Sequence, residues 1–165
     1  MHKLALVVLF SMAAAVASAQ VPTSGNVFFG YSYNHAEIVS HDGTNLNGWN
    51  ASLEGKMLPW VGIVADLSGT YGSHISHHNY LFGPRVSVEV GKYRPFAQFL
   101  AGASHVNVGD GTATDTSFSN AIGGGLDYHL KGPVAWRGQM DWIHTRFFSE
   151  SQNDVRFSTG IVIHF

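Results

Sequence analysis

The sequence predicts an all-β fold: an eight-stranded antiparallel up-and-down transmembrane β-barrel, preceded by a cleavable signal peptide. Three observations lead to this prediction. Apolar and polar residues alternate with a period of two in block after block, which is typical of strands with one apolar face. The connections between these blocks alternate between long polar segments and tight turns, and the chain begins with a short apolar stretch that ends in small residues.

The first residues have the three parts of a secretory signal peptide. His2 and Lys3 make a basic start, residues 4–17 are almost wholly apolar, and Ala17-Ser18-Ala19 forms an A-x-A cleavage site before Gln20. An N-terminal membrane anchor would need about 20 apolar residues, more than this stretch offers. We therefore expect residues 1–19 to be removed and residues 20–165 to form a single domain.

Eight blocks of alternating residues are expected to be strands. In one of the clear blocks, Ile63, Leu67 and Tyr71 alternate with Asp66 and Ser68. Two blocks, 27–33 and 95–107, alternate more weakly, and the pattern leaves the faces of 95–107 unassigned. The expected strands cover residues 27–33, 49–57, 62–71, 82–91, 95–107, 121–130, 134–142 and 155–165.

The connections between the blocks follow a regular order. Residues 38–46, 72–79, 108–117 and 147–153 are long and polar, whereas residues 58–60, 92–94 and 131–133 are short and contain the Pro and Gly of tight turns or border on them. An up-and-down barrel has long connections at one rim and short ones at the other. The pattern therefore indicates that both ends of the mature chain lie at the rim with the short turns.

The composition restricts the class of protein. Nineteen glycines, and an aromatic content of 13% against 12% charged residues, favour short packed strands over helices. The sequence after Gln20 has no stretch long and apolar enough to be a transmembrane helix. The formal charge is −2 and the basic residues are scattered, which argues against a nucleic-acid partner.

The polar face of the strands mixes opposite charges with very small residues. A soluble lipocalin-type barrel would show the same alternation with its apolar face turned inward, so periodicity alone leaves that alternative open. A face of paired charges and glycines suits a narrow eight-stranded interior better than a solvated surface. The expected interior charge network comprises Glu54, Lys56, Asp66, Arg85, Glu89, Asp127, Arg137, Asp141 and Arg156.

The apolar face is then expected to contact lipid. Strands of about ten residues rise roughly 3.3 Å per residue, which at a tilt near 40° covers about the 25 Å apolar band of an outer-membrane barrel. Aromatic residues near strand ends suit the two headgroup boundaries. They are Trp60, Tyr71, Tyr80, Tyr93, Trp142, Phe147 and Phe148.

With these features, residues 20–165 resemble the small outer-membrane β-barrels of the OmpA transmembrane-domain and OmpX kind. The most specific match is the last strand, in which Phe157, Thr159, Ile161, Ile163 and Phe165 alternate toward a terminal Phe. In that family this pattern is the signal read by the barrel assembly machinery. The resemblance implies a monomer in the bacterial outer membrane. Pro84 departs from the expectation, because a proline within a strand loses a ladder hydrogen bond; a bulge there or a different register would explain it.

We compare three functions that belong to different classes of protein. A structural or surface-interaction barrel is favoured, because eight strands leave room only for side chains in the interior; a narrow porin-like channel is the second interpretation. Some barrels of this size are lipid A-modifying enzymes, and the chain resembles the lipid A 3-O-deacylase at Ser119-Asn120. That enzyme has a His two residues before the Ser, where this chain has Ser117. Without a general base a serine is not activated, so no catalytic residue is expected.

Histidines are the remaining candidates for chemistry. His74, His77 and His78 have a spacing at which imidazoles bind zinc or copper. A loop that lacks a fixed scaffold and a carboxylate partner is more often simply solvated. We therefore expect neither a metal site nor a cofactor.

Overall fold

The computed structural model describes residues 24–36, 44–72, 75–108, 113–147 and 150–165. These residues form eight β-strands that follow one another along the chain. The strands are β1 (Gly25–Ala36), β2 (Thr44–Leu58), β3 (Val61–Gly72), β4 (Ile75–Ser87), β5 (Tyr93–Val108), β6 (Ala113–Lys131), β7 (Val134–Phe147) and β8 (Glu150–His164). Within the described ranges, no helix has the length and apolar character needed to cross a membrane.

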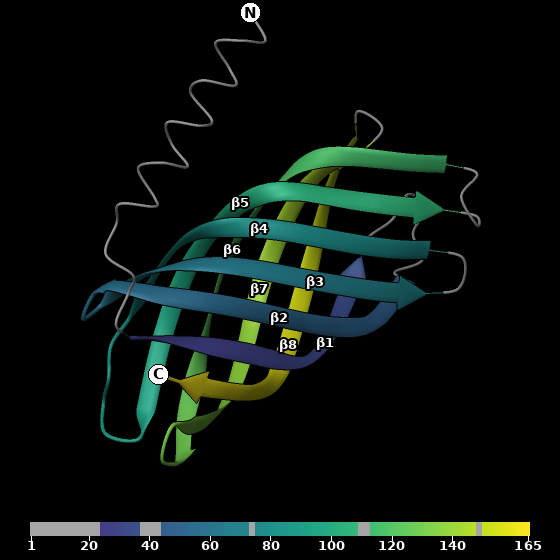
Figure 1. The fold of residues 1–165 in the computed structure, drawn as a ribbon. Helices are drawn as coiled ribbons and strands as arrows, with labels where there is room; N and C mark the ends of the chain where they lie inside the picture. Colours follow the sequence, from purple (N-terminus) through teal and green to yellow (C-terminus); the bar gives the residue numbers. More distant parts are fainter. Residues whose placement is uncertain (1–23, 37–43, 73–74, 109–112, 148–149) are drawn as a thin grey trace, which may run out of the picture.

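The strands form one closed antiparallel barrel in chain order (Figure 1). Each strand pairs with its neighbours in sequence, and β1 pairs with β8 over eleven residue pairs from Asn26↔His164 to Ala36↔Asp154. Gly25 and Phe165 continue this seam, because their backbone N–H groups donate to each other's carbonyl oxygens at 2.8 and 3.0 Å. The predicted eight-stranded up-and-down barrel is confirmed.

One rim of the barrel carries three short connections and both ends of the described chain; we call it the short-turn rim. Its connections are residues 59–60, 88–92 and 132–133. Gly91 and Gly132 have φ angles of 63° and 58°, a left-handed conformation that glycine adopts without steric cost. The register shifts next to two of these turns, between Lys56 and Leu58 and between His129 and Lys131.

The predicted boundaries were wrong in several places. The turn expected at residues 92–94 lies at Gly91-Lys92, and Tyr93 already begins β5. Each of the four connections expected to be long is partly strand, since β2, β4, β6 and β8 begin at Thr44, Ile75, Ala113 and Glu150. Near these starts the outward positions hold polar residues such as Asn47 and Thr116, so backbone pairing continues where the apolar outer face has ended.

For most residues of the strands, the predicted faces agree with the observed burial. Apolar side chains such as Leu53, Phe82 and Phe157 are exposed on the outside of the barrel, and their neighbours in sequence are buried. The face of β5 that the pattern left unassigned is settled: Phe96 and Leu100 point inward and Phe99 points outward.

Pro84 is accommodated without a bulge. It lies opposite Ile63 in β3, on the outer face of β4. The pairing of β4 with β5 keeps one register from Phe82↔Ala101 to Arg85↔Gln98 and has no pairs between them. The missing N–H of the proline therefore interrupts the ladder locally and leaves the register unchanged.

Exposed aromatic rings lie toward both ends of the strands. Trp60 and Tyr93 lie at the short-turn rim, whereas Tyr71, Tyr80 and Trp142 lie toward the opposite ends of β3, β4 and β7. All five are exposed. The side chain of Phe147 and the whole of Phe148, which were expected in the same girdle, lie outside the described part of the chain.

Candidate functional site: the charged interior of the barrel

A buried cluster of charges begins at Glu54 on β2. Its carboxylate accepts hydrogen bonds from Arg85 Nη1 at 3.0 Å, Arg94 Nη2 at 2.8 Å and Asn26 Nδ2 at 2.7 Å. All four side chains are buried. Two guanidinium groups thus meet one carboxylate, and the surplus positive charge needs a second acid nearby.

Asp127 supplies that second acid. Arg137 donates to it through two parallel hydrogen bonds, Nε to Oδ1 at 2.6 Å and Nη2 to Oδ2 at 2.8 Å. Arg94 Nη1 lies 4.0 Å from the same carboxylate. Bidentate pairs of this kind are the strongest ion-pair geometry in proteins, so β2, β5, β6 and β7 are linked through one set of charges.

Arg156 on β8 forms the second cluster. Its Nη1 donates to Asp66 Oδ1 and its Nη2 to Asp141 Oδ2, both at 2.8 Å, and Nη1 also donates to Ser68 Oγ at 2.8 Å. Asn50 Nδ2 donates to Asp66 at 3.0 Å. One buried guanidinium here bridges β3 and β7, which lie on different sides of the barrel interior.

Gln98 connects the two clusters. Its Oε1 accepts from Arg85 Nε and Nη2 at 3.0 and 2.6 Å, and its Nε2 donates to Asp141 Oδ1 at 2.6 Å. We call the connected set the interior network. It contains four guanidinium groups and four carboxylates, so its formal charges balance: Arg85, Arg94, Arg137, Arg156, Glu54, Asp66, Asp127 and Asp141.

Apolar side chains fill the space beside the network. The Phe96 ring contacts two guanidinium groups, its centroid lying 4.4 Å from Arg85 Cζ and 4.7 Å from Arg137 Cζ, a contact that the ring quadrupole favours. Phe28 lies 5.2 Å from Arg137 on another side. Two buried apolar clusters adjoin: Val64, Leu81, Leu100, Ala121 and Ile143 form one, and Phe28, Ala135 and Val162 form the other.

Solved structures with this architecture are known. Neisserial surface protein A superposes with a TM-score of 0.73 at 10% identity, over 86% of this chain and 97% of that chain. The outer membrane protein OprG from Pseudomonas aeruginosa gives 0.61 at 9% identity (88% and 97%). Ail, the attachment invasion locus protein of Yersinia pestis, gives 0.60 at 11% identity (86% and 98%).

The chain has the fold of the small eight-stranded outer-membrane β-barrels. No protein-family model and no curated protein matches its sequence. The likeness is therefore one of backbone architecture. The roles of individual side chains in this outer-membrane-type barrel have to be argued from its own contacts.

Lys56 and Glu89 were predicted to belong to the interior charge network, but they pair with each other outside it, and the Lys56 side chain is 15% exposed. Lys56 Nζ is 3.4 Å from Glu89 Oε1, but the Glu89 side chain is 66% exposed and the pair lies at the short-turn rim. Glu89 lies beyond the end of β4, so the alternation that continues through it in sequence no longer reports burial.

Sequence reasoning missed Arg94 and several amides. Arg94 was assigned to a turn, although it continues the inward alternation of Phe96, Gln98 and Leu100. Gly91 was the sequence feature that could have located the turn correctly. A turn at Gly91 starts the next strand at Tyr93, which places Arg94 on the inward face. Asn26, Asn50, Gln98 and Gln139 are buried as well, and they satisfy hydrogen bonds of the charged groups.

The two histidine candidates that the structure describes, His77 and His78, do not come together. His77 is buried on the inner face of β4 and His78 points outward, where its ring meets that of Tyr71 edge-on at 5.6 Å. Side chains on opposite faces of one strand cannot share an ion. His74 lies outside the described residues, within which no group of three His, Cys, Asp or Glu is placed to hold a metal.

Ser119 faces the barrel interior and is fully buried. Its hydroxyl lies 2.9 Å from the Thr145 hydroxyl and donates to the carbonyl oxygen of His144 at 3.5 Å. The His144 ring lies on the outer side and contacts Asn153 through Nδ1 at 2.8 Å. The serine therefore has the environment of a small strand residue.

Glycines leave space for the interior network, which yields a matched prediction. A Cβ at Gly123 would collide with Asp141 Oδ1, whereas a Cβ at Gly138 would have Trp136 at 3.5 Å as its nearest neighbour. We expect Gly123→Ala to lower the free energy of unfolding by about 1–3 kcal/mol. Gly138→Ala should be neutral or stabilise by up to about 1 kcal/mol. Urea unfolding of the lipid-inserted barrel measures both, and equal effects would contradict the assigned packing.

Proposed function

We propose that this chain is a bacterial outer-membrane protein with a structural or surface-interaction role and an interior closed by the interior network. One observation carries the proposal: burial is inverted relative to a water-soluble barrel. Arg137 and Glu54 are fully buried, whereas Phe29 and Ile122 are 65% and 61% exposed. Exposed apolar surface on this scale needs an apolar partner, and a lipocalin-type barrel would turn the same side chains inward.

The route to that membrane begins with export. Residues 1–19, which lie outside the described residues, have the features of a signal peptide, and residues 20–165 would form the mature barrel. The partners on the outer face would be outer-membrane lipids. Any extracellular ligand would meet the rim opposite the short-turn rim.

The closed interior supports a non-conducting role. Paired charges, Phe96 and two apolar clusters occupy the space inside the strands. We expect the purified protein in planar lipid bilayers to show no single-channel steps. Steps that recur with the folded barrel, and vanish when it is heat-unfolded, would instead establish the narrow-channel interpretation.

The surroundings of Ser119 support a non-enzymatic role. Its hydroxyl contacts Thr145 and a carbonyl oxygen, and neither group can activate a serine for attack on an ester. An unchanged lipid A mass in cells that express the protein is the corresponding expectation. Loss of an acyl chain on expression would overturn this part of the proposal.

Assembly would use the last strand. Phe157, Ile161, Ile163 and Phe165 are exposed on the outside of the barrel, in the pattern that the resemblance identifies as the signal for the barrel assembly machinery. We expect Phe165→Ala to reduce the outer-membrane level of the protein several-fold. Phe118→Ala, which removes an equally exposed ring from β6, should not. Equal levels of the two variants would show that the barrel assembly machinery does not recognise the terminal Phe.

A further inference from the structure

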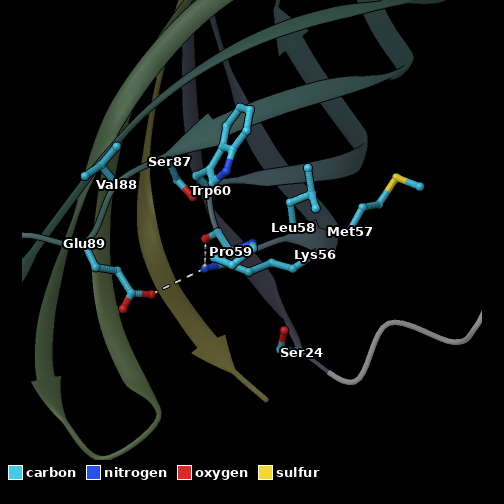
Figure 2. A pocket seen from close by; sticks show the side chains of 9 residues that line it. All are labelled: Ser24, Lys56, Met57, Leu58, Pro59, Trp60, Ser87, Val88 and Glu89. Carbon is cyan, nitrogen blue, oxygen red and sulfur yellow. Dashed lines mark hydrogen bonds and ion pairs between the residues drawn. The ribbon is translucent and has the colours of Figure 1, made fainter.

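A recess of about 640 Å³ opens at the short-turn rim (Figure 2). It lies outside the interior network, between the β2–β3 turn and the β4–β5 connection. The residues that matter for its chemistry are Lys56, Met57, Leu58, Trp60, Val88 and Glu89.

Its polar part is an ammonium beside a carboxylate. Lys56 Nζ donates to the carbonyl oxygen of Pro59 at 3.2 Å and lies 3.4 Å from Glu89 Oε1, as the dashed lines in Figure 2 show. An ammonium carries three N–H donors, and within the described ranges the structure gives acceptors to two of them. Glu89 is mostly exposed, so its carboxylate can also meet a ligand.

Its apolar part adjoins the outer surface of the barrel. Met57, Leu58, Trp60 and Val88 are all exposed. Leu58 and Trp60 flank Pro59 in the β2–β3 turn, so they lie next to the carbonyl oxygen that positions the Lys56 ammonium. An indole at such a boundary suits the level of lipid headgroups. A ligand held here would meet one positive charge, one negative charge and an apolar wall.

We propose that the recess binds the headgroup of a zwitterionic phospholipid that carries a phosphate and a primary ammonium. The Lys56 ammonium would donate to the phosphate oxygens and the Glu89 carboxylate would accept from the lipid ammonium, while the upper acyl chains lie against Leu58 and Trp60. This inference rests on the proposed function, because it requires the short-turn rim to lie in a lipid leaflet.

Charge and shape both favour this ligand. An anionic lipid offers a phosphate for Lys56 but no cation for Glu89, whose negative charge would then face it unpaired. A free phosphate would leave the apolar wall without a partner. Exchanging the Lys56–Glu89 pair for two pairs with the lipid costs little, because the Glu89 side chain is 66% exposed and a pair at the surface is worth at most about 1 kcal/mol.

Lipid retention by the intact protein tests the proposal. Native mass spectrometry of the detergent-purified barrel would compare phosphatidylethanolamine with phosphatidylglycerol at equal concentration. We expect preferential retention of phosphatidylethanolamine. Lys56→Gln should lower that retention about tenfold, the effect of losing one charged hydrogen bond. Glu89→Gln should abolish the preference between the two lipids.

Matched controls separate this site from general charge effects. Lys92→Gln removes an exposed lysine from the same rim and should leave retention unchanged. Water-soluble phosphoethanolamine at the same concentration should not displace the lipid. Equal retention of both lipids by the unaltered protein, an equal loss in Lys92→Gln, or displacement by phosphoethanolamine would each overturn the inference.

The failure of this inference can be told from failure of the proposed function. Heat-modifiable gel migration reports whether each variant is a folded barrel, and membrane fractionation reports where the unaltered protein resides. A folded outer-membrane protein that retains both lipids equally would contradict this inference and leave the proposed function intact. A protein found outside the membrane would contradict both the inference and the proposed function.

Discussion

Arg156→Met is expected to lower the free energy of unfolding by about 3–5 kcal/mol, the cost of leaving buried charges without their partner. Arg156 donates to Asp66 and Asp141 at 2.8 Å each, and all three side chains are fully buried. Methionine keeps much of the volume but none of the five donors. The two carboxylates would then face each other across a space that water reaches poorly. Urea unfolding of the barrel in lipid vesicles measures the change.

Two further variants distinguish lost pairing from lost packing. Glu89→Gln breaks an ion pair of which one partner is mostly exposed, and should cost less than about 1 kcal/mol. The triple variant Arg156→Met, Asp66→Asn, Asp141→Asn also removes the two carboxylate charges that Arg156→Met leaves unpaired. It should recover much of the stability lost in Arg156→Met. A triple variant no more stable than Arg156→Met alone would show that the charges themselves are not what the arginine supports.

Ile122→Lys is the second substitution with a large expected effect. Ile122 lies in the middle of β6 and is 61% exposed on the outside of the barrel. A lysine at the middle of the apolar band of an outer-membrane barrel costs about 2–4 kcal/mol. We therefore expect Ile122→Lys to destabilise the lipid-inserted barrel by this amount and to lower its level in the outer membrane.

Val90→Lys is the matched control for depth. Val90 is 59% exposed, almost the same as Ile122, but it lies at the short-turn rim beside Gly91. Near the membrane boundary the same substitution costs about 0–1 kcal/mol. Equal, small effects at both positions would mean that the outer face contacts water along its whole length.

The sequence predicted the part of each strand in which apolar and polar residues alternate. In 62–71 and 155–165 the assigned faces agree with the observed burial, except that Gly69 on the outer face is buried. The strands extend beyond the apolar outer face, because the backbone still pairs at outward polar residues such as Asn47 and Thr116. Hydrophobic periodicity shows which side chains face lipid and which face the interior. It does not show where a strand ends, because backbone hydrogen bonds continue past the last apolar residue.

The composition of the interior network was predicted less completely than the fold. Burial of Glu54, Asp66, Arg85, Asp127, Arg137, Asp141 and Arg156 follows from their place on the polar face of strands. Arg94 was missed because the turn was predicted at 92–94 and not at Gly91-Lys92. Lys56 and Glu89 were included because the alternation of the sequence continues into the rim.

The partners within the network could not be read from the sequence. Arg156 and Asp66 are 90 residues apart along the chain and lie on strands that do not pair. Their contact depends on how far each side chain reaches across the closed barrel. The amides of Gln98 and Asn50 complete the network through side-chain hydrogen bonds, and nothing in their local sequence distinguishes them from solvated amides.

Refolding of the purified chain with and without an amphiphile tests the inverted arrangement of faces most directly. With detergent micelles or lipid vesicles, we expect a folded, heat-modifiable monomer; in plain buffer, the exposed rings of Phe29, Phe82 and Trp142 should drive aggregation. A dispersed, folded monomer in plain buffer would contradict the proposal that the apolar side chains of this barrel face lipid.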